Sequence, residues 1–432
     1  MLYYSLNKNA PIVNFKTATI EGQAPDKGLY FPETIPAVNK KLLQHIENYS
    51  NAAIAYNVIK PFVGDAIPEY ILKDIVEETV NFEIPLVKIS DSISSLELFH
   101  GPTLAFKDIG ARFMSRCLGY FAKERTAKII VLVATSGDTG GAVANGFYDV
   151  PGIDVVILYP SGKVSSVQEK QLTTLGKNIH AIEVNGSFDD CQKMVKETFM
   201  DEGLKQKVFL TSANSINVAR WLPQQFYYFF LWKQWEDKNN PPTVAVPSGN
   251  FGNICAGLVA KKSGLPIKHF IAACNANDTV PEFFNTGIYT PKKAIATISN
   301  AMDVGDPSNF VRILELFGNE NNNLKNILSS TSITDAETAK TLLQVFKENN
   351  YLLDPHGAVA YNALQTYLIT KPTNKGVILE TAHPVKFYDV IEPITKQKVH
   401  IPLQIADQLK LKKESLKMDI DVEMLKGYLL KL

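Results

Sequence analysis

Short, wholly apolar runs alternate with amphipathic stretches through most of the 432-residue chain. Strands that are buried on both faces have this continuous apolar character, and their alternation with helical patterns is typical of parallel βαβ units. The alternation begins near residue 95 and predicts an α/β fold with parallel sheets. The runs that carry this prediction are 129–133, 155–158, 244–246, 270–273 and 377–379.

The first 90 or so residues have a different character, with short apolar runs interrupted by prolines. Two helices are expected there, over 37–50 and 69–82. A chain of this length is too long for one hydrophobic core. We therefore expect a small N-terminal domain, 1–90, ahead of the βαβ region.

Charge excludes two classes of partner. The chain has 44 basic and 44 acidic residues, and no long stretch concentrates one sign. A nucleic-acid-binding face or a membrane-binding helix is not indicated. Any anion that this protein binds must be held by a local site.

The cysteines and the N-terminus indicate a reducing compartment. No two cysteines have metal-ligand or redox-motif spacing, so buried free thiols and no metal are expected. The first 15 residues contain no charged leader followed by an apolar run. We expect a cytoplasmic protein. The cysteines are Cys117, Cys191, Cys255 and Cys274.

A lysine at position 107 lies in an apolar setting. It follows a Gly-Pro turn and precedes the helical pattern 109–121, so it is expected near a helix N-terminus. Desolvation and the positive end of the helix dipole both disfavour an ammonium there. A neutral amine is what a Schiff-base nucleophile requires. Taken alone, an ordinary surface lysine remains the alternative.

Two glycine-rich turns between a strand and a helix have the composition of anion-binding loops. In 135–141, hydroxyls, glycines and helix-start N–H groups suit a carboxylate or phosphate, with a tight, well-capped turn as the alternative. In 248–253, glycines let backbone N–H groups approach an anion closely. The second loop has neither the dinucleotide nor the triphosphate signature. It therefore indicates a cofactor with a single phosphate.

A third candidate anion site is 214–220, which ends in Arg220 before the helical pattern 221–235. Amide, hydroxyl and guanidinium groups within about one turn can surround a phosphate, with the arginine as a fork. An ordinary helix start is the alternative for this segment.

In their order along the chain, these segments resemble those of the threonine synthase family, pyridoxal-phosphate (PLP) enzymes of fold type II. The segment 99–108 resembles the PLP-lysine segment, and 135–141 the substrate-carboxylate loop. The segment 214–220 resembles the substrate-phosphate segment, and 248–253 the cofactor-phosphate loop.

Two further segments extend the resemblance to nearly the whole chain. Residues 380–387 are similar to the family's segment that supplies a hydroxyl to the pyridine nitrogen. Residues 21–30 are similar to the N-terminal domain of the longer, bacterial and fungal type.

The resemblance implies an α/β fold of two parallel-sheet βαβ domains of the tryptophan synthase β-like type, after the small N-terminal domain. The implied bounds are 1–90, 91–240 and 241–432. The second part would contain Lys107 and the carboxylate loop and would exchange segments in part with the third. The third would contain the cofactor-phosphate loop and the C-terminal helices.

The resemblance also implies a role for each matching residue. Lys107 would be the catalytic residue, binding PLP covalently and then acting as a mobile base, and Thr381 would face the pyridine nitrogen. The cofactor phosphate would be bound, chiefly through backbone N–H groups, by Gly249, Asn250, Phe251, Gly252 and Asn253. The substrate carboxylate would be held by Ser136, Gly137, Asp138 and Thr139. The substrate phosphate would be held by Asn214, Ser215 and Arg220, with Arg112 as a weaker candidate.

Position 138 departs from many fold-type-II enzymes, which have asparagine in this loop. An ionised Asp138 would repel a substrate carboxylate. We therefore expect its side chain to turn away or to contact a protonated group. For His383 and His100 packing is expected, and 354–357 is expected to form a turn before the helix 358–368.

The implied reaction converts O-phospho-L-homoserine and water into L-threonine and phosphate, the last step of threonine biosynthesis. Alternatives are a related O-phosphohomoserine phospho-lyase or an amino-acid dehydratase that gives a keto acid, and a non-catalytic phosphate-binding protein. The expected partner is the small-molecule substrate, with no nucleic acid and no membrane, and the expected assembly is a monomer or homodimer.

Overall fold

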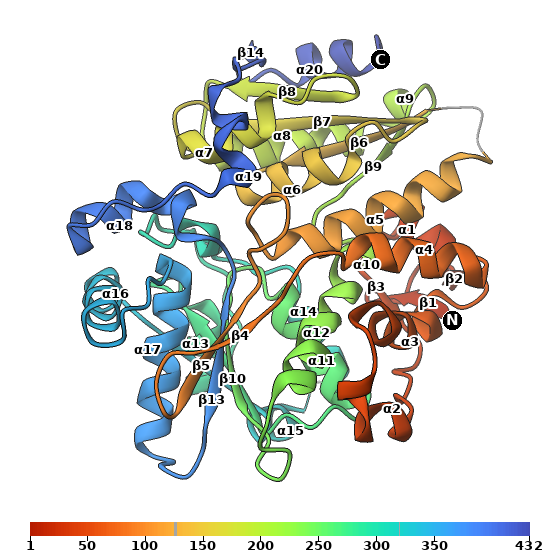
Figure 1. Cartoon of the computed structure of the whole chain (residues 1–432). Helices are drawn as coiled ribbons and strands as arrows, with labels where there is room; N and C mark the ends of the chain where they lie inside the picture. The colour runs from red at the N-terminus through yellow and green to blue at the C-terminus, as the bar shows by residue number, and fades with distance from the viewer. Residues whose placement is uncertain (125–127, 319) are drawn as a thin grey trace.

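Two parallel sheets and one small antiparallel sheet organise the chain (Figure 1). The computed structural model describes residues 1–124, 128–318 and 320–432. The predicted fold class is confirmed, since every predicted apolar run lies within a strand of a parallel sheet. Within the described ranges, no helix combines the length and the apolarity that a membrane span requires.

The five-stranded sheet is parallel throughout and lies at the top of Figure 1. In spatial order its strands are β14 (Leu416–Met418), β8 (Ile179–Val184), β7 (Ile153–Pro160), β6 (Ile129–Ala134) and β9 (Phe209–Thr211). The helices near it are α5 (Lys107–Ala122), α6 (Asp138–Phe147), α7 (Ser166–Thr173), α8 (Phe188–Met200), α9 (Glu202–Lys205), α19 (Leu403–Ala406) and α20 (Val422–Leu429).

The six-stranded sheet is parallel except for its edge strand β4, which runs antiparallel to β5. In spatial order its strands are β12 (Leu328–Ser332), β11 (His269–Cys274), β10 (Thr243–Pro247), β13 (Gly376–Glu380), β5 (Ile93–Glu97) and β4 (Leu86–Lys88). The helices near it are α10 (Val218–Trp221), α11 (Gln225–Gln234), α12 (Gly252–Lys262), α13 (Thr279–Thr286), α14 (Phe310–Leu316), α15 (Asn321–Lys325), α16 (Asp335–Asn349), α17 (Pro355–Ile369) and α18 (Tyr388–Thr395).

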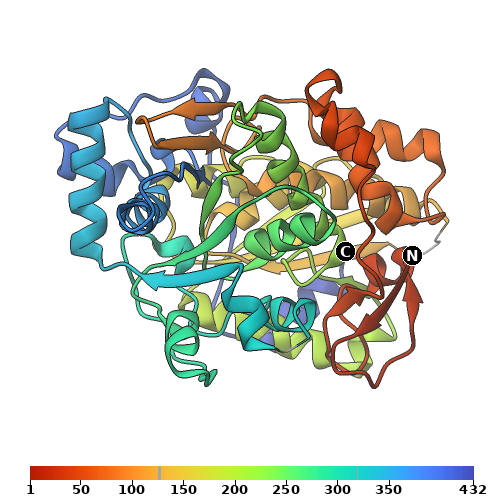
Figure 2. The ribbon, with the colours of Figure 1, turned by 90° about the horizontal axis from the view of Figure 1, so that it is seen from below.

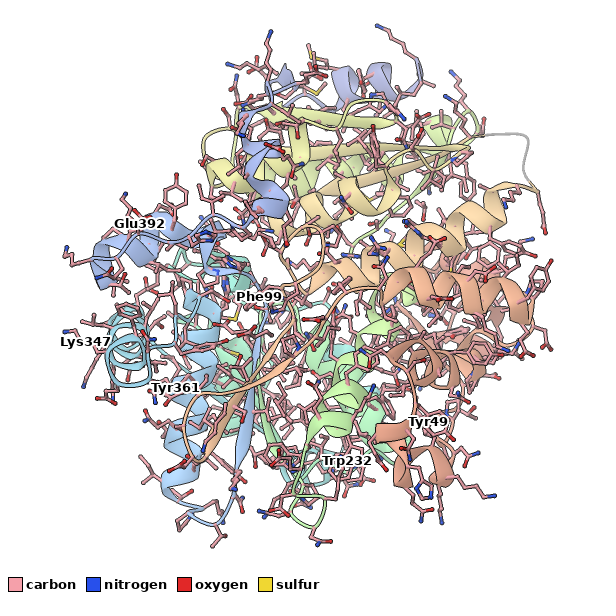
Figure 3. The ribbon with its side chains drawn as sticks, viewed as in Figure 1. Tyr49, Phe99, Trp232, Lys347, Tyr361 and Glu392 are labelled. Atoms are coloured by element: carbon pink, nitrogen blue, oxygen red, sulfur yellow. The ribbon has the colours of Figure 1, made fainter. Side chains whose placement is uncertain are left out.

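Burial on both faces explains why the strands are continuous apolar runs. In β10, Val244 and Val246 pack into the core that contains Trp232 of α11. The intervening Ala245 packs into a separate core with Tyr361 of α17. Figure 3 labels Trp232 and Tyr361 on opposite sides of this sheet, and Figure 2 shows the same helices from below. Strand β10 therefore buries both of its alternating faces, and β6, β7, β11 and β13 are likewise buried along their whole length.

Sheet membership does not follow chain order. Strand β5 pairs in parallel with β13, although about 280 residues separate the two along the chain. Every strand of the five-stranded sheet except β14 lies in the sequence between them. Strand β14, near the C-terminus, pairs with β8 of the five-stranded sheet. The two parallel sheets are therefore tied together by chain segments that leave one and join the other.

The N-terminal part forms the antiparallel sheet and a group of helices beside α5 and α10 (Figure 1). Strand β1 pairs antiparallel with both β2 and β3. The elements are β1 (Leu2–Ser5), β2 (Val13–Asn14), α1 (Phe15–Glu21), β3 (Tyr30–Pro32), α2 (Lys40–Gln44), α3 (Asn51–Val63) and α4 (Glu69–Thr79).

One of the two helices predicted here is wrong. The structure has the short α2 and a 3₁₀ turn in place of a helix over 37–50, and then the longer α3. The reason is capping: Ser50, which was expected inside the helix, accepts a hydrogen bond from the backbone N–H of Ala53 and begins α3. The other predicted helix is confirmed as α4, which begins after Pro68. The four cysteines are free and buried, as expected.

The central strands of the five-stranded sheet should be critical for stability. Leu132 of β6 is fully buried, so Leu132→Ala should lower the free energy of unfolding by about 2–5 kcal/mol through lost contacts and a cavity. Urea denaturation measures the loss. The matched change Leu403→Ala, at a side chain that is 88% exposed, should have almost no effect. Equal losses would contradict the assigned packing.

Candidate active site

A cavity of about 850 Å³ lies where strands of both parallel sheets end. Its lining includes the residues directly after β6, β10 and β13, together with Pro160 at the end of β7. Ligands of open α/β sheets bind at the carboxyl ends of strands, where loops bring backbone N–H groups and polar side chains together. The position of the cavity therefore follows from the fold.

The cavity brings together most of the residues singled out in the sequence, although they come from five separate segments. The predicted residues that line it are Lys107, Ser136, Asp138, Thr139, Asn214, Ser215, Arg220, Gly249, Asn250, Phe251, Gly252, Asn253 and Thr381.

Gly137 and Arg112 are not among the lining residues. The N–H of Gly137 donates to Thr135 Oγ1 at 2.9 Å, so this glycine shapes the turn at φ 137°. Arg112 points toward the end of α4, where its Nη2 donates to the Glu78 carbonyl at 2.5 Å and to Asn81 Oδ1 at 3.1 Å. Arg112 is five residues along α5 from Lys107, which places it on another side of the helix.

Lys107 is the first residue of α5, and backbone pairing fixes its position. The N–H of Phe106 donates to the carbonyl of Thr381 at 2.9 Å, and the N–H of His383 donates to the carbonyl of Leu104 at 3.0 Å. A short antiparallel bridge between 105 and 382 therefore holds the lysine beside Thr381.

The amine of Lys107 is available for chemistry. No hydrogen bond or ion pair of the described residues involves its Nζ atom, which lies 5.7 Å from the centre of the Phe106 ring. Burial lowers the pKa of Lys107 to about 8; the charge of Asp138 opposes this shift, and the smaller effects of Arg220 and Lys386 add to it. The physical argument for a partly neutral amine therefore agrees with the geometry.

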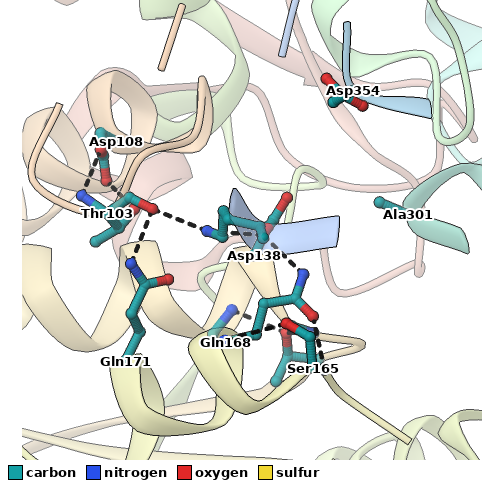
Figure 4. A network of polar contacts seen from close by, with 12 residues as sticks. Thr103, Asp108, Asp138, Ser165, Gln168, Gln171, Ala301 and Asp354 are labelled. Atoms are coloured by element: carbon teal, nitrogen blue, oxygen red, sulfur yellow. Dashed lines mark hydrogen bonds and ion pairs between the residues drawn. The ribbon is translucent and has the colours of Figure 1, made fainter. Parts of the chain in front are cut away.

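Asp138 forms a buried ion pair that the sequence did not identify (Figure 4). Its Oδ1 atom lies 2.8 Å from Lys386 Nζ and accepts a hydrogen bond from Gln168 Nε2 at 2.9 Å. Burial alone would raise the pKa of Asp138, but the charges of Lys386 and Lys107 hold it lower, at about 2. Asp138 contacts a protonated group, as expected, and does not present a bare charge to the cavity.

Lys386 also joins the loop before Lys107 to this ion pair. Its Nζ atom donates to the carbonyl of Thr103 at 2.8 Å, and Gln171 Nε2 donates to the same carbonyl at 3.1 Å. The Thr103 N–H donates to Asp108 at 2.9 Å (Figure 4). Four segments that are distant in sequence are thus held in one polar network around the reactive lysine.

The loop 248–253 contains a buried side-chain donor without a protein partner. Asn253, at the start of α12, accepts a hydrogen bond at Oδ1 from Tyr228 at 2.6 Å, while its buried Nδ2 atom has no protein partner. The preceding Phe251 has φ 60°, a left-handed conformation that turns the chain sharply into the helix. The tyrosine fixes the amide orientation, so the Nδ2 donor remains free for a ligand.

Arg220 is buried, with 4% of its surface exposed. Its Nη1 atom donates to the carbonyl of Lys107 at 3.1 Å, and its Nε atom has no hydrogen-bond partner. No carboxylate of the described residues forms an ion pair with it. Burial lowers its pKa to about 10. A buried guanidinium whose donors are not all bonded within the protein is costly, so Arg220 is a candidate for binding an anion.

The histidines near the site have packing and turn roles. His356 Nδ1 contacts Asp354 at 2.5 Å, and its Nε2 accepts from the N–H of Ala301 at 3.2 Å, which anchors the loop before α14 at the cavity. His383 accepts from the N–H of Val385 at 3.1 Å and packs edge-on against Phe99. The packing role expected for His383 agrees with these contacts, but the turn expected over 354–357 is wrong, because Asp354 caps α17 and the helix already begins at Pro355.

Sequence analysis missed several residues that support the site, namely Lys386, Gln168, Tyr227, Tyr228 and Arg312. The sequence offers one signal for Lys386, because it lies between the apolar residues Val385 and Phe387. A lysine in such a setting can be buried when it is paired, and Lys386 has no exposed surface. The others are ordinary residues in sequence, and only folding brings them to the loops.

Three family models match the chain. The model of pyridoxal-phosphate dependent enzymes matches residues 94–381. The models of the threonine synthase N terminus and of the threonine synthase C-terminal part match residues 2–80 and 357–429.

Similar proteins cover the chain from end to end. Threonine synthase of Buchnera aphidicola subsp. Acyrthosiphon pisum is 44% identical over 413 residues, which is 95% of each chain. The crystal structure of threonine synthase from Escherichia coli is 41% identical, with a TM-score of 0.92 over 100% of both chains. PLP-bound threonine synthase from Brucella melitensis is 33% identical, with a TM-score of 0.93 over 100% of this chain and 99% of that one.

Lys386→Met should make the Lys107 amine more basic. Burial remains, but the change removes a nearby positive charge and leaves the Asp138 carboxylate free to stabilise the ammonium form of Lys107. The pH dependence of the rate of PLP uptake by the apoprotein measures this, since only the neutral amine reacts. The midpoint, near pH 8 in the unaltered protein, should move upward. Lys193→Met, at an exposed lysine, is the control and should leave the midpoint unchanged. An unchanged midpoint for Lys386→Met would contradict the electrostatic effect assigned to Lys386.

Proposed function

Because this chain belongs to the threonine synthase family of PLP-dependent enzymes, we propose that the cavity around Lys107 and Arg220 binds and converts O-phospho-L-homoserine. The activity is that of the family, a PLP-dependent carbon–oxygen lyase reaction in which the substrate and water give L-threonine and phosphate. The observation that supports the substrate assignment is the buried, unpaired guanidinium of Arg220.

The residues fit a PLP group. Lys107 offers an amine with a pKa of about 8, and Asn253 offers an unpaired buried donor in a loop that begins a helix. The loop residues 249–253 would hold the cofactor phosphate. Thr381, whose carbonyl receives the N–H of Phe106, would offer its hydroxyl to the ring nitrogen.

When bound, PLP supplies an electron sink for the negative charge that develops at the substrate's α-carbon. The protein supplies proton transfer and placement. Lys107 would remove the proton at Cα and then one at Cβ, as phosphate leaves from Cγ; Cγ gains a proton and Cα regains one, and water adds its hydroxyl group at Cβ, which balances the product. The lowered pKa of Lys107 keeps part of the amine neutral near physiological pH. A carboxylate beside the pyridine nitrogen would favour its protonated form. The hydroxyl of Thr381 would instead leave this nitrogen largely unprotonated and so weaken the electron sink.

Placement comes from two anion sites on opposite ends of the substrate. Ser136 and Thr139, with the N–H groups at the start of α6, hold the carboxylate, and Asp138 is neutralised by Lys386 so that it does not repel it. Asn214, Ser215 and Arg220 hold the phosphate that leaves from Cγ. We omit Arg112 from this set, because its guanidinium is bound at the end of α4.

We also propose the wider setting of this enzyme. It acts in the cytoplasm as a monomer or homodimer. It binds no nucleic acid, which is supported by its balanced charge and by the absence of any long basic stretch in the sequence. The domain bounds 1–90, 91–240 and 241–432 remain our proposal for the units that fold together, with β5 and β14 as the exchanged segments.

Arg220→Ala should raise KM for O-phosphohomoserine by about ten- to a hundredfold, because charge-assisted contacts to the phosphate are lost. PLP should remain bound, as followed by its visible absorbance. Steady-state kinetics measure KM. The matched control Arg112→Ala should leave KM unchanged, since that arginine faces α4. Equal KM values for Arg220→Ala and the unaltered enzyme would remove the phosphate assignment.

Product analysis separates threonine synthesis from the phospho-lyase and dehydratase alternatives. O-Phosphohomoserine should give threonine and phosphate in equal amounts, with little 2-ketobutyrate. Lys107→Ala should abolish both turnover and the visible absorbance band, because the covalent link to PLP cannot form. Stoichiometric 2-ketobutyrate, or an active Lys107→Ala enzyme, would overturn the assignment.

A further inference from the structure

The N-terminal part contacts the segment Asn214–Trp221 directly. Asn217 Nδ2 donates to the carbonyl of Thr19 in α1 at 2.8 Å. The ring of Phe31 in β3 stacks on Trp221, with centroids 6.1 Å apart and planes 5° from parallel. These contacts hold both the beginning and the end of the short helix α10, which carries Arg220.

Arg312 of α14 completes this contact from the other side. Its side chain is fully buried, and its Nη1 atom donates to the carbonyl of Ser215 at 3.0 Å. Its Nη2 atom donates to the carbonyls of Ile216 and Tyr30, the latter at 3.2 Å. The guanidinium also lies 4.8 Å from the Trp221 ring. One cation thus bridges the N-terminal strand β3 and the segment Asn214–Trp221.

Arg312 has no carboxylate partner among the described residues, so backbone carbonyls satisfy its charge. Burial lowers its pKa to about 9. A buried cation is costly, and an apolar side chain of similar size would serve stability equally well. Its fork of donors has a geometric use, since it fixes several carbonyls relative to one another.

The same network reaches the loop 248–253. Asn309 accepts from Arg312 at 2.5 Å, and its Nδ2 atom donates to Ser215 Oγ at 3.1 Å and to the carbonyl of Asn250 at 2.9 Å. Asn250 Nδ2 donates to Ser215 Oγ at 2.7 Å. The loop proposed for the cofactor phosphate and the segment proposed for the substrate phosphate are therefore held in a fixed relation.

We infer that Arg312 and the N-terminal contacts at Thr19, Tyr30 and Phe31 act together to position the segment Asn214–Trp221, so that the Arg220 guanidinium meets the substrate phosphate. The N-terminal part is then a component of the substrate site although it lines no part of the cavity described above. This inference rests on the proposed function of Arg220. Arg312 is a positioning residue, which touches neither substrate nor cofactor.

The reason that positioning matters is that Arg220 has few constraints of its own. Among the described residues its side chain has one hydrogen-bond acceptor, the carbonyl of Lys107, and its Nε atom has none. Displacement of a binding group by about 1 Å can cost roughly a hundredfold in rate. Weakening the contacts around Trp221 should therefore act on phosphate binding first.

Phe31→Leu tests the N-terminal contact without touching the site. It removes the stacked ring from Trp221 and should raise KM for O-phosphohomoserine by about two- to tenfold. The inhibition constant of inorganic phosphate against the holoenzyme should rise by the same factor, with kcat and the PLP absorbance nearly unchanged. A purely structural role would lower the melting temperature and leave both constants alone.

Phe15→Leu is the matched control. Phe15 belongs to the same N-terminal part and is fully buried, but its ring contacts are Tyr3 and Phe121, away from α10. It should lower the melting temperature to an extent similar to Phe31→Leu, without changing KM or the phosphate inhibition constant. If the two variants shift these constants equally, the inference is wrong.

Arg312→Lys tests the clamp itself. A lysine keeps the charge but lacks the planar fork, so KM and the phosphate inhibition constant should rise together by about tenfold or more. Arg116→Lys is the control, because Arg116 also bonds a carbonyl, that of Gly146, from a position outside the network. Should Arg312→Lys fail to fold, the Phe31→Leu comparison decides.

The outcome for Arg220 separates the two proposals. If Arg220→Ala leaves KM unchanged, the proposed phosphate site itself fails. If Arg220→Ala raises KM while Phe31→Leu and Arg312→Lys behave like their controls, the phosphate site stands and only the positioning role is overturned.

Discussion

Burial of positive charge at the junction of two sheets is the constraint on which this structure depends. Desolvating a cation is costly unless a partner compensates for it. Lys386 is compensated by Asp138, and Arg312 by backbone carbonyls. Lys107 and Arg220 have no carboxylate partner among the described residues. We propose that ligands compensate these two groups, a phosphate-bearing cofactor at Lys107 and a phosphorylated substrate at Arg220.

The fold makes this arrangement possible by bringing loops from both sheets to one cavity. The segment exchange through β5 and β14 ties the sheets together, and the bridge between 105 and 382 fixes Lys107 against the residues after β13. The polar contacts of Lys386 and Arg312 then connect loops that lie hundreds of residues apart in sequence. Residues that contact no ligand thus hold in place the residues that would, as a preorganised site requires.

Much of this could be predicted from sequence, for identifiable reasons. Strands such as β6 and β10 are buried on both faces, so their apolar runs were unambiguous, and the glycine-rich turns after them marked the anion loops. Arg112 was misplaced because sequence proximity to Lys107 does not specify a helix face. Arg312 was missed because its role depends on Tyr30 and Ser215, neither of which is near it in sequence. Position along the chain predicts local structure well, but it predicts poorly the contacts between residues that are distant in sequence.

The central claim is that the Arg220 guanidinium is a buried charge that awaits a phosphate, and thermal unfolding tests it most directly. Inorganic phosphate should raise the melting temperature of the holoenzyme, because it binds the folded state alone. The Arg220→Met holoenzyme should be at least as stable without phosphate and should not respond to it, since the charge that phosphate compensates has been removed. An equal phosphate-induced rise in both proteins would contradict the account.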